Sequence, residues 1–328
     1  MEYTTLGRTG MSVSRIGLGC NTLGLDSSSR WEWSVGEAKS KELVDRAVEL
    51  GINFFDTANS YSWGDSERVL GEALAEHDRE EMVVATKVYN EAEPDAHPNA
   101  SGLSRKTIEQ ELDNSLDRLG MDYVDLYQTH RWDAETPIET TLRGLTDAVK
   151  RGDAMAVGAS SMWTYQFAEA LQTSQDRGLE PFATMQNHYN LAYREEEREM
   201  LPFCAEKDVG VIPWAPLAGG FLARPHDQLE ATTRGKTSSS VRRRSYPDNG
   251  GVEINERAEE LAADKGVSMA QIAVAWLLHQ EWVTAPIVGV TKLEHLDDIV
   301  EATEVTLSDS DQAYLEAPYE PGPVAGHE

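Results

Sequence analysis

The chain has 328 residues and a formal net charge of −28 at pH 7, which excludes nucleic acid and anionic membranes as expected partners. It has no apolar run near the ~20 residues that cross a bilayer and no basic-then-apolar signal at its amino terminus, so we expect a cytoplasmic protein. Nine Lys against twenty Arg in so acidic a chain favour a halophilic protein, whose self-repulsion is screened by salt, over an ordinary acidic one.

The predicted elements begin with a β-hairpin, since Tyr3–Leu6 and Met11–Val13 flank the turn Gly7-Arg8-Thr9-Gly10. Short apolar runs and amphipathic helices then alternate without a break in composition. The predicted strands are 16–19, 52–56, 82–87, 124–129, 154–160, 184–186, 211–214 and 285–288. The predicted helices are 39–50, 66–75, 106–119, 137–151, 163–177, 195–207, 253–265, 269–279 and 293–302. This alternation predicts one α/β domain over residues 1–328, a (β/α)8 TIM barrel with residues 1–14 as a hairpin cap.

One long stretch, residues 221–251, has no helical pattern and contains the polar run Ser238–Ser240 and three consecutive Arg at 242–244. It is too long to be a passive connection. We therefore expect it to be a loop that covers a bound cofactor.

The residues that end the predicted strands carry the functional prediction. They are, in order, Gly19, Asp56, Lys87, His130, Ser160, Gln186, Trp214 and Gly289. In a barrel these ends share one face, where active sites of this architecture are built. Each polar residue has a structural alternative, such as Lys87 pairing with Asp56 to neutralise a core charge. Together they leave too much buried polarity for a purely structural role.

These side chains suit proton delivery to a carbonyl oxygen. Tyr61 follows Asp56 by five residues, and a phenol with a pKa near ~10 is a weak acid at neutral pH. We expect the Lys87 ammonium to lower the pKa of Tyr61 and Asp56 to hold that ammonium in place. His130 is expected to orient the substrate oxygen.

None of these groups donates hydride, so the chemistry requires a redox cofactor. Trp214 offers a face for a nicotinamide ring, and Ser160 and Gln186 offer partners for its carboxamide. The chain lacks a GxGxxG motif at the start of a helix, which argues against a Rossmann domain. Neither the eight His nor the widely separated Cys20 and Cys204 have a metal-binding spacing, so no metal site is expected.

The sequence resembles the aldo-keto reductases over nearly its whole length. The resemblance is closest to the bacterial and yeast branch near the aryl-alcohol dehydrogenases and to the potassium-channel β-subunits. It implies a (β/α)8 barrel and NADPH-dependent reduction of aldehydes or ketones, with Tyr61 as proton donor, Lys87 and Asp56 as its activators and His130 as orienter. The matching motifs are Leu6–Gly10, Ile16–Gly19, Gly51–Leu74, Ala85–Lys87, Gln128–Asp133, Gly158–Ser161, Met185–Asn190 and Pro213–Leu217.

The same resemblance implies a set of cofactor contacts, although two positions depart from the family pattern. His295 stands where many members have an Arg or Gln for the 2′-phosphate, and Ile299 replaces a common Asn. NADPH is the cofactor that the resemblance implies, and these two departures leave NADH open as an alternative. The implied cofactor residues are Asp56, Ser160, Ser161, Gln186, Trp214, Ala215, Pro216, Leu217, Gly219, Arg234, Gly289, Thr291, His295 and Asp298.

The expected substrate is a small carbonyl compound, apolar or aryl, because five aromatic residues fall in loops at the carboxyl-end face. Two other functions remain open. One is a nicotinamide-binding redox sensor or regulatory subunit with vestigial activity, and the other is a cofactor-free barrel such as a sugar isomerase. The sequence makes no prediction of oligomeric state. The five aromatic residues are Trp31, Trp33, Trp63, Tyr89 and Trp132.

Overall fold

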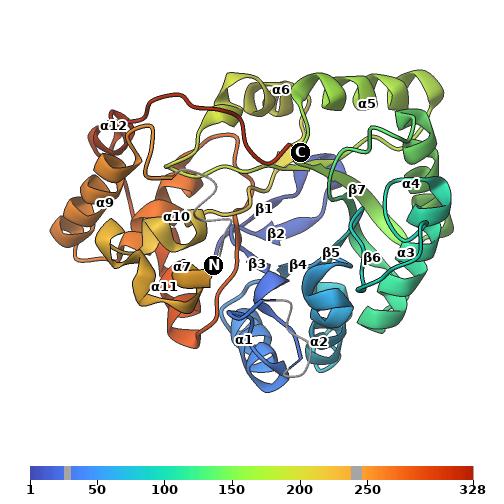
Figure 1. The fold of residues 1–328 in the computed structure, drawn as a ribbon, viewed down its shortest axis with the longest axis horizontal. Helices are drawn as coiled ribbons and strands as arrows, with labels where there is room; N and C mark the ends of the chain where they lie inside the picture. The colour runs from blue at the N-terminus through green and yellow to red at the C-terminus, as the bar shows by residue number, and fades with distance from the viewer. Residues whose placement is uncertain (26–30, 238–245, 328) are drawn as a thin grey trace.

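Ten strands organise the protein in a computed structural model that describes residues 1–25, 31–237 and 246–327. Their bounds are β1 (Tyr3–Thr5), β2 (Ser12–Ser14), β3 (Gly17–Gly19), β4 (Phe54–Asp56), β5 (Val83–Val88), β6 (Val124–Thr129), β7 (Ala154–Ser160), β8 (Thr184–Gln186), β9 (Gly210–Val211) and β10 (Ile287–Val288). Strands β3 to β10 form one parallel sheet in the order β10-β3-β4-β5-β6-β7-β8-β9. Parallel bridges Val211–Val283 and Trp214–Ile287 join its two edges and close the predicted (β/α)8 barrel (Figure 1).

Helices surround the barrel and cover its outer face (Figure 1). Their bounds are α1 (Glu37–Glu49), α2 (Asp65–Leu74), α3 (Arg105–Leu119), α4 (Ile138–Arg151), α5 (Thr164–Arg177), α6 (Met200–Glu206), α7 (Thr233–Thr237), α9 (Gly251–Lys265), α10 (Met269–His279), α11 (Leu293–Glu301) and α12 (Asp309–Glu316). In α3, the Ser104 side chain accepts from Thr107 N at the start, and Gly120 ends the helix in the left-handed region with φ 63°. No single described helix is long and apolar enough to span a membrane. Helices α9 and α10 meet the length and hydropathy criteria only when they are taken together, and the chain bends by 99° between them.

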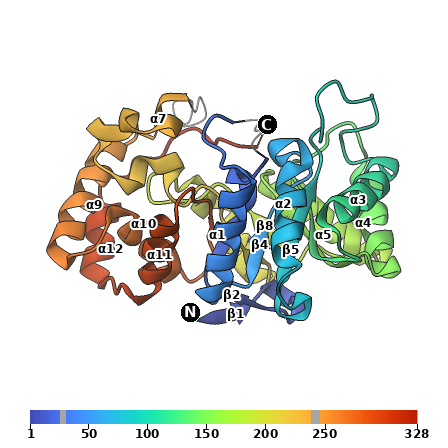
Figure 2. The same cartoon turned by 90° about the horizontal axis from the view of Figure 1, so that it is seen from below.

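The predicted hairpin is present and caps one end of the barrel. Strands β1 and β2 pair antiparallel, with Tyr3 opposite Ser14. Leu6 and Val13 pack with Phe54, at the first position of β4, and with other barrel-interior side chains. Figure 2 shows the hairpin at the end of the molecule opposite α7 and the carboxyl terminus. The carboxyl ends of the strands are therefore the face left for a site.

Several elements of the carboxyl-terminal half differ from the prediction, including β9 and β10, which are shorter than the predicted strands 211–214 and 285–288. The predicted helix 195–207 is split into a 3-10 turn, η5 (Glu195–Arg198), and α6, because Glu199 between them has φ −144°. The turn holds the end of the chain, since Glu195 accepts hydrogen bonds from Tyr319 OH and Gly322 N. Helix α12 was not predicted, although the capping box of Ser308 and Asp311 that starts it is visible in the sequence.

The stretch 221–251 contains more helix than expected. It includes the end of η6 (Ala218–Ala223), then η7 (His226–Ala231) and α7, before α9 begins at Gly251. Residues 238–245, with the polar run and the three Arg, lie outside the described residues. Its role as a cofactor cover stays a prediction.

Candidate active site

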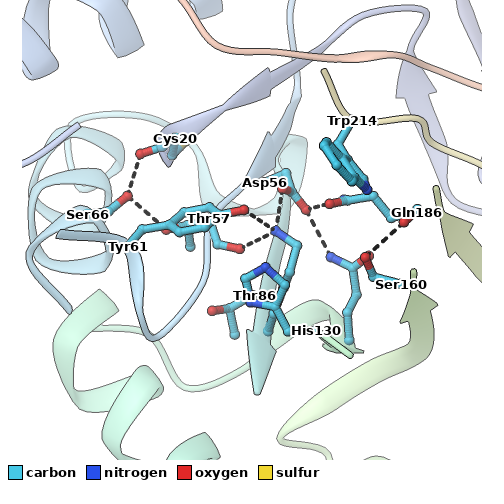
Figure 3. A network of polar contacts seen from close by, with 12 residues as sticks. Cys20, Asp56, Thr57, Tyr61, Ser66, Thr86, His130, Ser160, Gln186 and Trp214 are labelled. Atoms are coloured by element: carbon cyan, nitrogen blue, oxygen red, sulfur yellow. Dashed lines mark hydrogen bonds and ion pairs between the residues drawn. The ribbon is translucent and has the colours of Figure 1, made fainter. Parts of the chain in front are cut away.

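The predicted catalytic side chains Asp56, Lys87 and Tyr61 meet at the carboxyl ends of β4 and β5, where Figure 3 shows Asp56 and Tyr61. The Lys87 ammonium donates to Asp56 Oδ1 at 2.5 Å, to the Thr57 carbonyl at 2.8 Å and to Tyr61 OH at 3.2 Å. Lys87 is 0 % exposed and Asp56 1 %. An ammonium can stay charged at this depth because all three of its hydrogens have acceptors and one acceptor is a carboxylate.

A strained turn holds Tyr61 in place. Tyr61 begins η3 (Tyr61–Gly64), in which Ser62 and Trp63 have φ values of 48° and 58°. Left-handed geometry costs a non-glycine residue about 1–2 kcal/mol. The Ser62 hydroxyl offsets part of this cost by donating to the Leu23 carbonyl at 2.8 Å. Strain at this point is consistent with a functional constraint on the phenol.

The ionisation of Tyr61 and Lys87 differs in one respect from the expectation. Burial raises the pKa of Tyr61, and although the Lys87 charge acts in the expected lowering direction, the net shift is upward. Burial lowers the pKa of Lys87, but Asp56 and Tyr61 outweigh it and the net shift is also upward. Near neutral pH the site therefore holds a neutral phenol beside a charged ammonium. The lowering influence expected of Lys87 is present, but burial of the phenol outweighs it, and sequence proximity gives no measure of burial.

The fourth predicted residue, His130, lies just beyond β6 and faces the phenol. Its ring stands edge-on to Tyr61 with the centroids 5.7 Å apart. Asn90 Nδ2 lies 3.2 Å from His130 Nδ1. Because an amide nitrogen only donates, Nδ1 accepts and the imidazole proton is on Nε2. Asn90 was not predicted; its place three residues after Lys87, at the same strand end, was the available signal.

Asp56 also has a second pair of contacts. Its Oδ2 accepts from Gln128 Nε2 and from Gln186 Nε2, each at 2.9 Å. Gln186 was predicted as a carboxamide partner, which stays a prediction, and here it contacts the Asp56 carboxylate. Gln128 was overlooked, although it lies on the same face of β6 as the barrel-interior residue Leu126.

Trp214 belongs to an aromatic stack at the end of β9. Its indole lies parallel to His188, with centroids 4.4 Å apart, and His188 lies parallel to Tyr193 at 4.0 Å. The indole N–H donates to Ser161 Oγ at 3.0 Å. We call Trp214, His188 and Tyr193 the indole stack. It fixes the orientation of the Trp214 indole, and a planar ligand ring needs such a fixed aromatic surface to stack on. His188 and Tyr193 were not predicted.

The loop after Trp214 contains several residues with left-handed backbone geometry. Ala215, Ala218 and Gly219 all have left-handed φ values, of 55°, 51° and 68°, while the predicted residues Pro216 and Leu217 lie between them. The Ala215 carbonyl accepts from Asn190 Nδ2 at 2.9 Å. Ser160 lies nearby at the end of β7, where its hydroxyl donates to the Gln186 carbonyl at 2.8 Å.

The start of α11 offers donors for a phosphate. The N-cap residue Lys292, which directly follows Thr291, makes no side-chain hydrogen bond to this end, while the Glu294 carboxylate in the first turn accepts from its own backbone N–H. A Cβ on Gly289 would lie 2.9 Å from Asn21 Oδ1. A larger residue at position 289 would therefore have to displace the Asn21 side chain.

Positive side chains gather around the same helix start. Partial burial lowers the pKa of His295, and the charges of Lys292 and Arg224 act in the same direction, so the imidazole is neutral near pH 7. Arg224 lies in the predicted covering stretch but had not been singled out. Arg234, which had been, lies in α7, and its side chain is outside the described part of the structure. Asp298 accepts a hydrogen bond from Ser268 Oγ at 2.7 Å, and its cofactor role stays a prediction.

The five aromatic residues predicted for the mouth lie in carboxyl-end loops. Trp31 and Trp33 stack in parallel at 5.7 Å, and Trp31 is 41 % exposed. Trp63, Tyr89 and Trp132 are half-buried. Tyr89 and Trp132 pack against the main hydrophobic core, and Trp31 is the most exposed of the five.

The cysteines and acidic groups form no second reactive centre within the described residues. Cys20 and Cys204 are buried and unpaired, and burial raises the pKa of both thiols. A protonated, buried thiol is unreactive. No group of three or more His, Cys, Asp or Glu among residues 1–25, 31–237 and 246–327 is placed to hold a metal ion.

The sequence is similar to known reductases and dehydrogenases along its length. A Schizosaccharomyces pombe protein, whose name assigns it to the aryl-alcohol dehydrogenases, is 40 % identical over 347 residues, covering 99 % of this chain and 97 % of its own. Versiconal hemiacetal acetate reductase of Aspergillus parasiticus is 39 % identical over 345 residues, covering 98 % of each chain. An aldo-keto reductase of Alternaria alternata is 38 % identical over 352 residues, covering 99 % of this chain and 93 % of its own. The sequence profile of the Aldo/keto reductase family matches residues 15–320, and the chain belongs to this family.

Proposed function

We propose that this protein uses NADPH to reduce aryl and other apolar aldehydes or ketones to alcohols, with Tyr61 as the proton donor. One observation carries the proposal: the Lys87 ammonium lies 3.2 Å from Tyr61 OH and 2.5 Å from Asp56 Oδ1. A neutral phenol beside a fixed cation can release its proton into a reaction and be stabilised as it does so.

The residues around this phenol fit a bound nicotinamide. The indole stack gives a fixed aromatic surface, and Figure 3 shows its Trp214 near Asp56, Gln186 and Ser160. Gln186 donates to Asp56, and Ser160 donates to the Gln186 carbonyl. The reduced nicotinamide, when bound, supplies the hydride. Glycine at position 289 and the start of α11 suit the closely packed phosphates of such a cofactor.

Each of the four side chains then has one task in the transfer of a proton to the carbonyl oxygen. Tyr61 gives its proton to that oxygen, and the Nε2–H of His130 donates a hydrogen bond to it. The phenolate left on Tyr61 is stabilised by the Lys87 ammonium. Asp56 keeps Lys87 charged and aimed, which preserves this stabilisation from one turnover to the next.

Steady-state loss of NADPH absorbance with benzaldehyde tests the proposal against a sensor function. Many turnovers per active site are expected. A single slow turnover would instead indicate a redox sensor, and failure to bind either nicotinamide would indicate a cofactor-free barrel.

The tryptophan pair at the mouth predicts a preference for aromatic substrates. We expect kcat/KM to be higher for benzaldehydes than for short sugars. We expect Trp31→Ala to lower kcat/KM for benzaldehyde about threefold to tenfold, since an aromatic pair contributes about 0.5–1.5 kcal/mol. The same variant should leave propanal reduction unchanged. Tyr314→Ala, on the remote helix α12, is the matched control. Equal rates with benzaldehydes and sugars would refute the aromatic preference.

The cations near α11 predict the choice between nicotinamides. The 2′-phosphate distinguishes NADPH from NADH, and Arg224 and Lys292 are two described positive groups whose charges act on His295. We expect Arg224→Met to raise the KM for NADPH about tenfold and to leave the KM for NADH within about twofold, because one charge-assisted contact is lost. Lys265→Met, which removes a surface cation paired with Asp311, is the control. A parallel loss with both cofactors would show that Arg224 does not read the phosphate.

A further inference from the structure

Gln128 occupies an unusual position inside the barrel. In the strand register it lies between Lys87 on β5 and Gly158 on β7, and Gly158 in turn aligns with Thr184 on β8. Its side chain is 0 % exposed. An uncharged amide this deep in a core is costly unless its hydrogen bonds are made.

Only half of that amide is satisfied. Gln128 Nε2 donates to Asp56 Oδ2 at 2.9 Å, whereas Oε1 is buried and has no hydrogen-bond partner among the described residues. Rotating the amide would place its carbonyl oxygen against the carboxylate, which is repulsive. A Leu or Met would fill the same volume without leaving an unpaired oxygen. The N–H directed at Asp56 is therefore the feature that explains an amide here.

The neighbouring strand makes room for this amide. A Cβ on Gly158 would lie 3.1 Å from Gln128 Cγ and 2.3 Å from Thr184 Oγ1. Any larger residue at position 158 would displace the Gln128 side chain. The packing thus supports the reach of Gln128 across the barrel to Asp56.

We propose that Gln128 is a positioning residue for the proton transfer, holding Asp56 so that one carboxylate oxygen faces Lys87 and partly offsetting its negative charge at Tyr61. This inference rests on the proposed function of Tyr61 as the proton donor. The Gln128 amide donates to Asp56, which in turn accepts from Lys87, so Gln128 acts on Tyr61 through the Asp56–Lys87 pair.

The charges that face Tyr61 determine the direction of the expected effect. Lys87 on β5 and Arg131 after β6 favour the phenolate, whereas Asp56 on β4 opposes it. His130 faces the ring edge-on, and buried Cys20 stays protonated behind Asp56. Loss of the Gln128 N–H leaves the Asp56 charge less compensated. The pKa of Tyr61 should then rise further, and its proton should be released less readily.

Gln128→Met tests this inference because it keeps the volume and removes the donor. We expect kcat for reduction to fall about tenfold at neutral pH, since one hydrogen bond to a charged group is lost. The alkaline limb of the kcat profile should move to higher pH, while the Kd for NADPH stays within about twofold. Thr129→Val is the control, because Thr129 Oγ1 is also buried without a partner, on the same strand. It should keep the wild-type rate and pH profile.

Two measurements separate a positioning role from a structural one. Thermal unfolding should show Gln128→Met folded, and Gln128→Leu repeats the test if it is not. An unmoved alkaline limb, or an equal loss in Thr129→Val, would overturn the inference. The ionisation of Tyr61 can also be followed without turnover, by a pH titration of phenolate absorbance. The part of this signal that is missing in Tyr61→Phe belongs to Tyr61. If the wild type reduces no carbonyl, the proposed function fails, whereas this titration still decides whether Gln128 acts on Tyr61.

Discussion

Replacing Tyr61 with Phe is expected to lower kcat/KM for carbonyl reduction by about 10²–10⁴-fold, the usual contribution of a general acid. The substitution removes one hydroxyl and leaves the ring, which packs edge-on against His130. The proposed cofactor surface on Trp214 is untouched, so the Kd for NADPH should stay within about twofold. Steady-state kinetics and a fluorescence titration of cofactor binding check both outcomes.

The pH dependence of the wild type gives an independent check on the same residue. Because the pKa of Tyr61 is raised by burial, the phenol keeps its proton through neutral pH and reduction should stay active there. The rate of reduction should fall only as pH rises through that raised pKa, above the usual ~10. Alcohol oxidation needs the phenolate and should increase over the same range.

A control and a contrary outcome complete the test of Tyr61. Tyr314→Phe removes an exposed hydroxyl that donates to Glu260 on the remote helix α9, and it should leave the kinetics unchanged. If Tyr61→Phe turned over at a rate comparable with the wild type, Tyr61 would not be the acid.

Arg118→Met is expected to cost about 3–5 kcal/mol in the free energy of unfolding, because it leaves a buried carboxylate without its partner. Arg118 Nε lies 2.6 Å from Glu67 Oε2, and these side chains are 12 % and 0 % exposed. Glu67 also accepts from Thr86 Oγ1. A Cβ on Gly64 would lie 2.8 Å from Arg118 Cδ, so the same guanidinium side chain supports the turn that carries Tyr61.

Denaturant unfolding measures this effect, and two further variants interpret it. The double variant Glu67→Gln with Arg118→Met also removes the Glu67 charge and should be less destabilised than Arg118→Met alone. Arg177→Met removes an exposed arginine that pairs with Glu139 and should change the free energy of unfolding by less than about 1 kcal/mol. If Arg118→Met were as mild as Arg177→Met, the pair with Glu67 would not be a principal support of this region.

The sequence determined the succession of elements and the face that carries the site. Predicted bounds of β6, β7, β8 and α10 agree with the structure, because the apolar pattern and turn residues that define them are local. The barrel followed from the alternation of strands and helices. Parallel strands place all carboxyl ends on one face, so the sequence alone predicted that Asp56 and Lys87 lie close together.

Only the tertiary structure decided how the polar groups share their contacts. The amide of Gln128 on Asp56, the amide of Asn90 on His130 and the ring of His188 behind Trp214 join segments that are distant in sequence. The upward shift in the pKa of Tyr61 likewise depends on how deeply the whole fold buries the phenol. Periodicity and motifs report the neighbours of a residue along the chain, whereas hydrogen bonds and desolvation depend on distances across it.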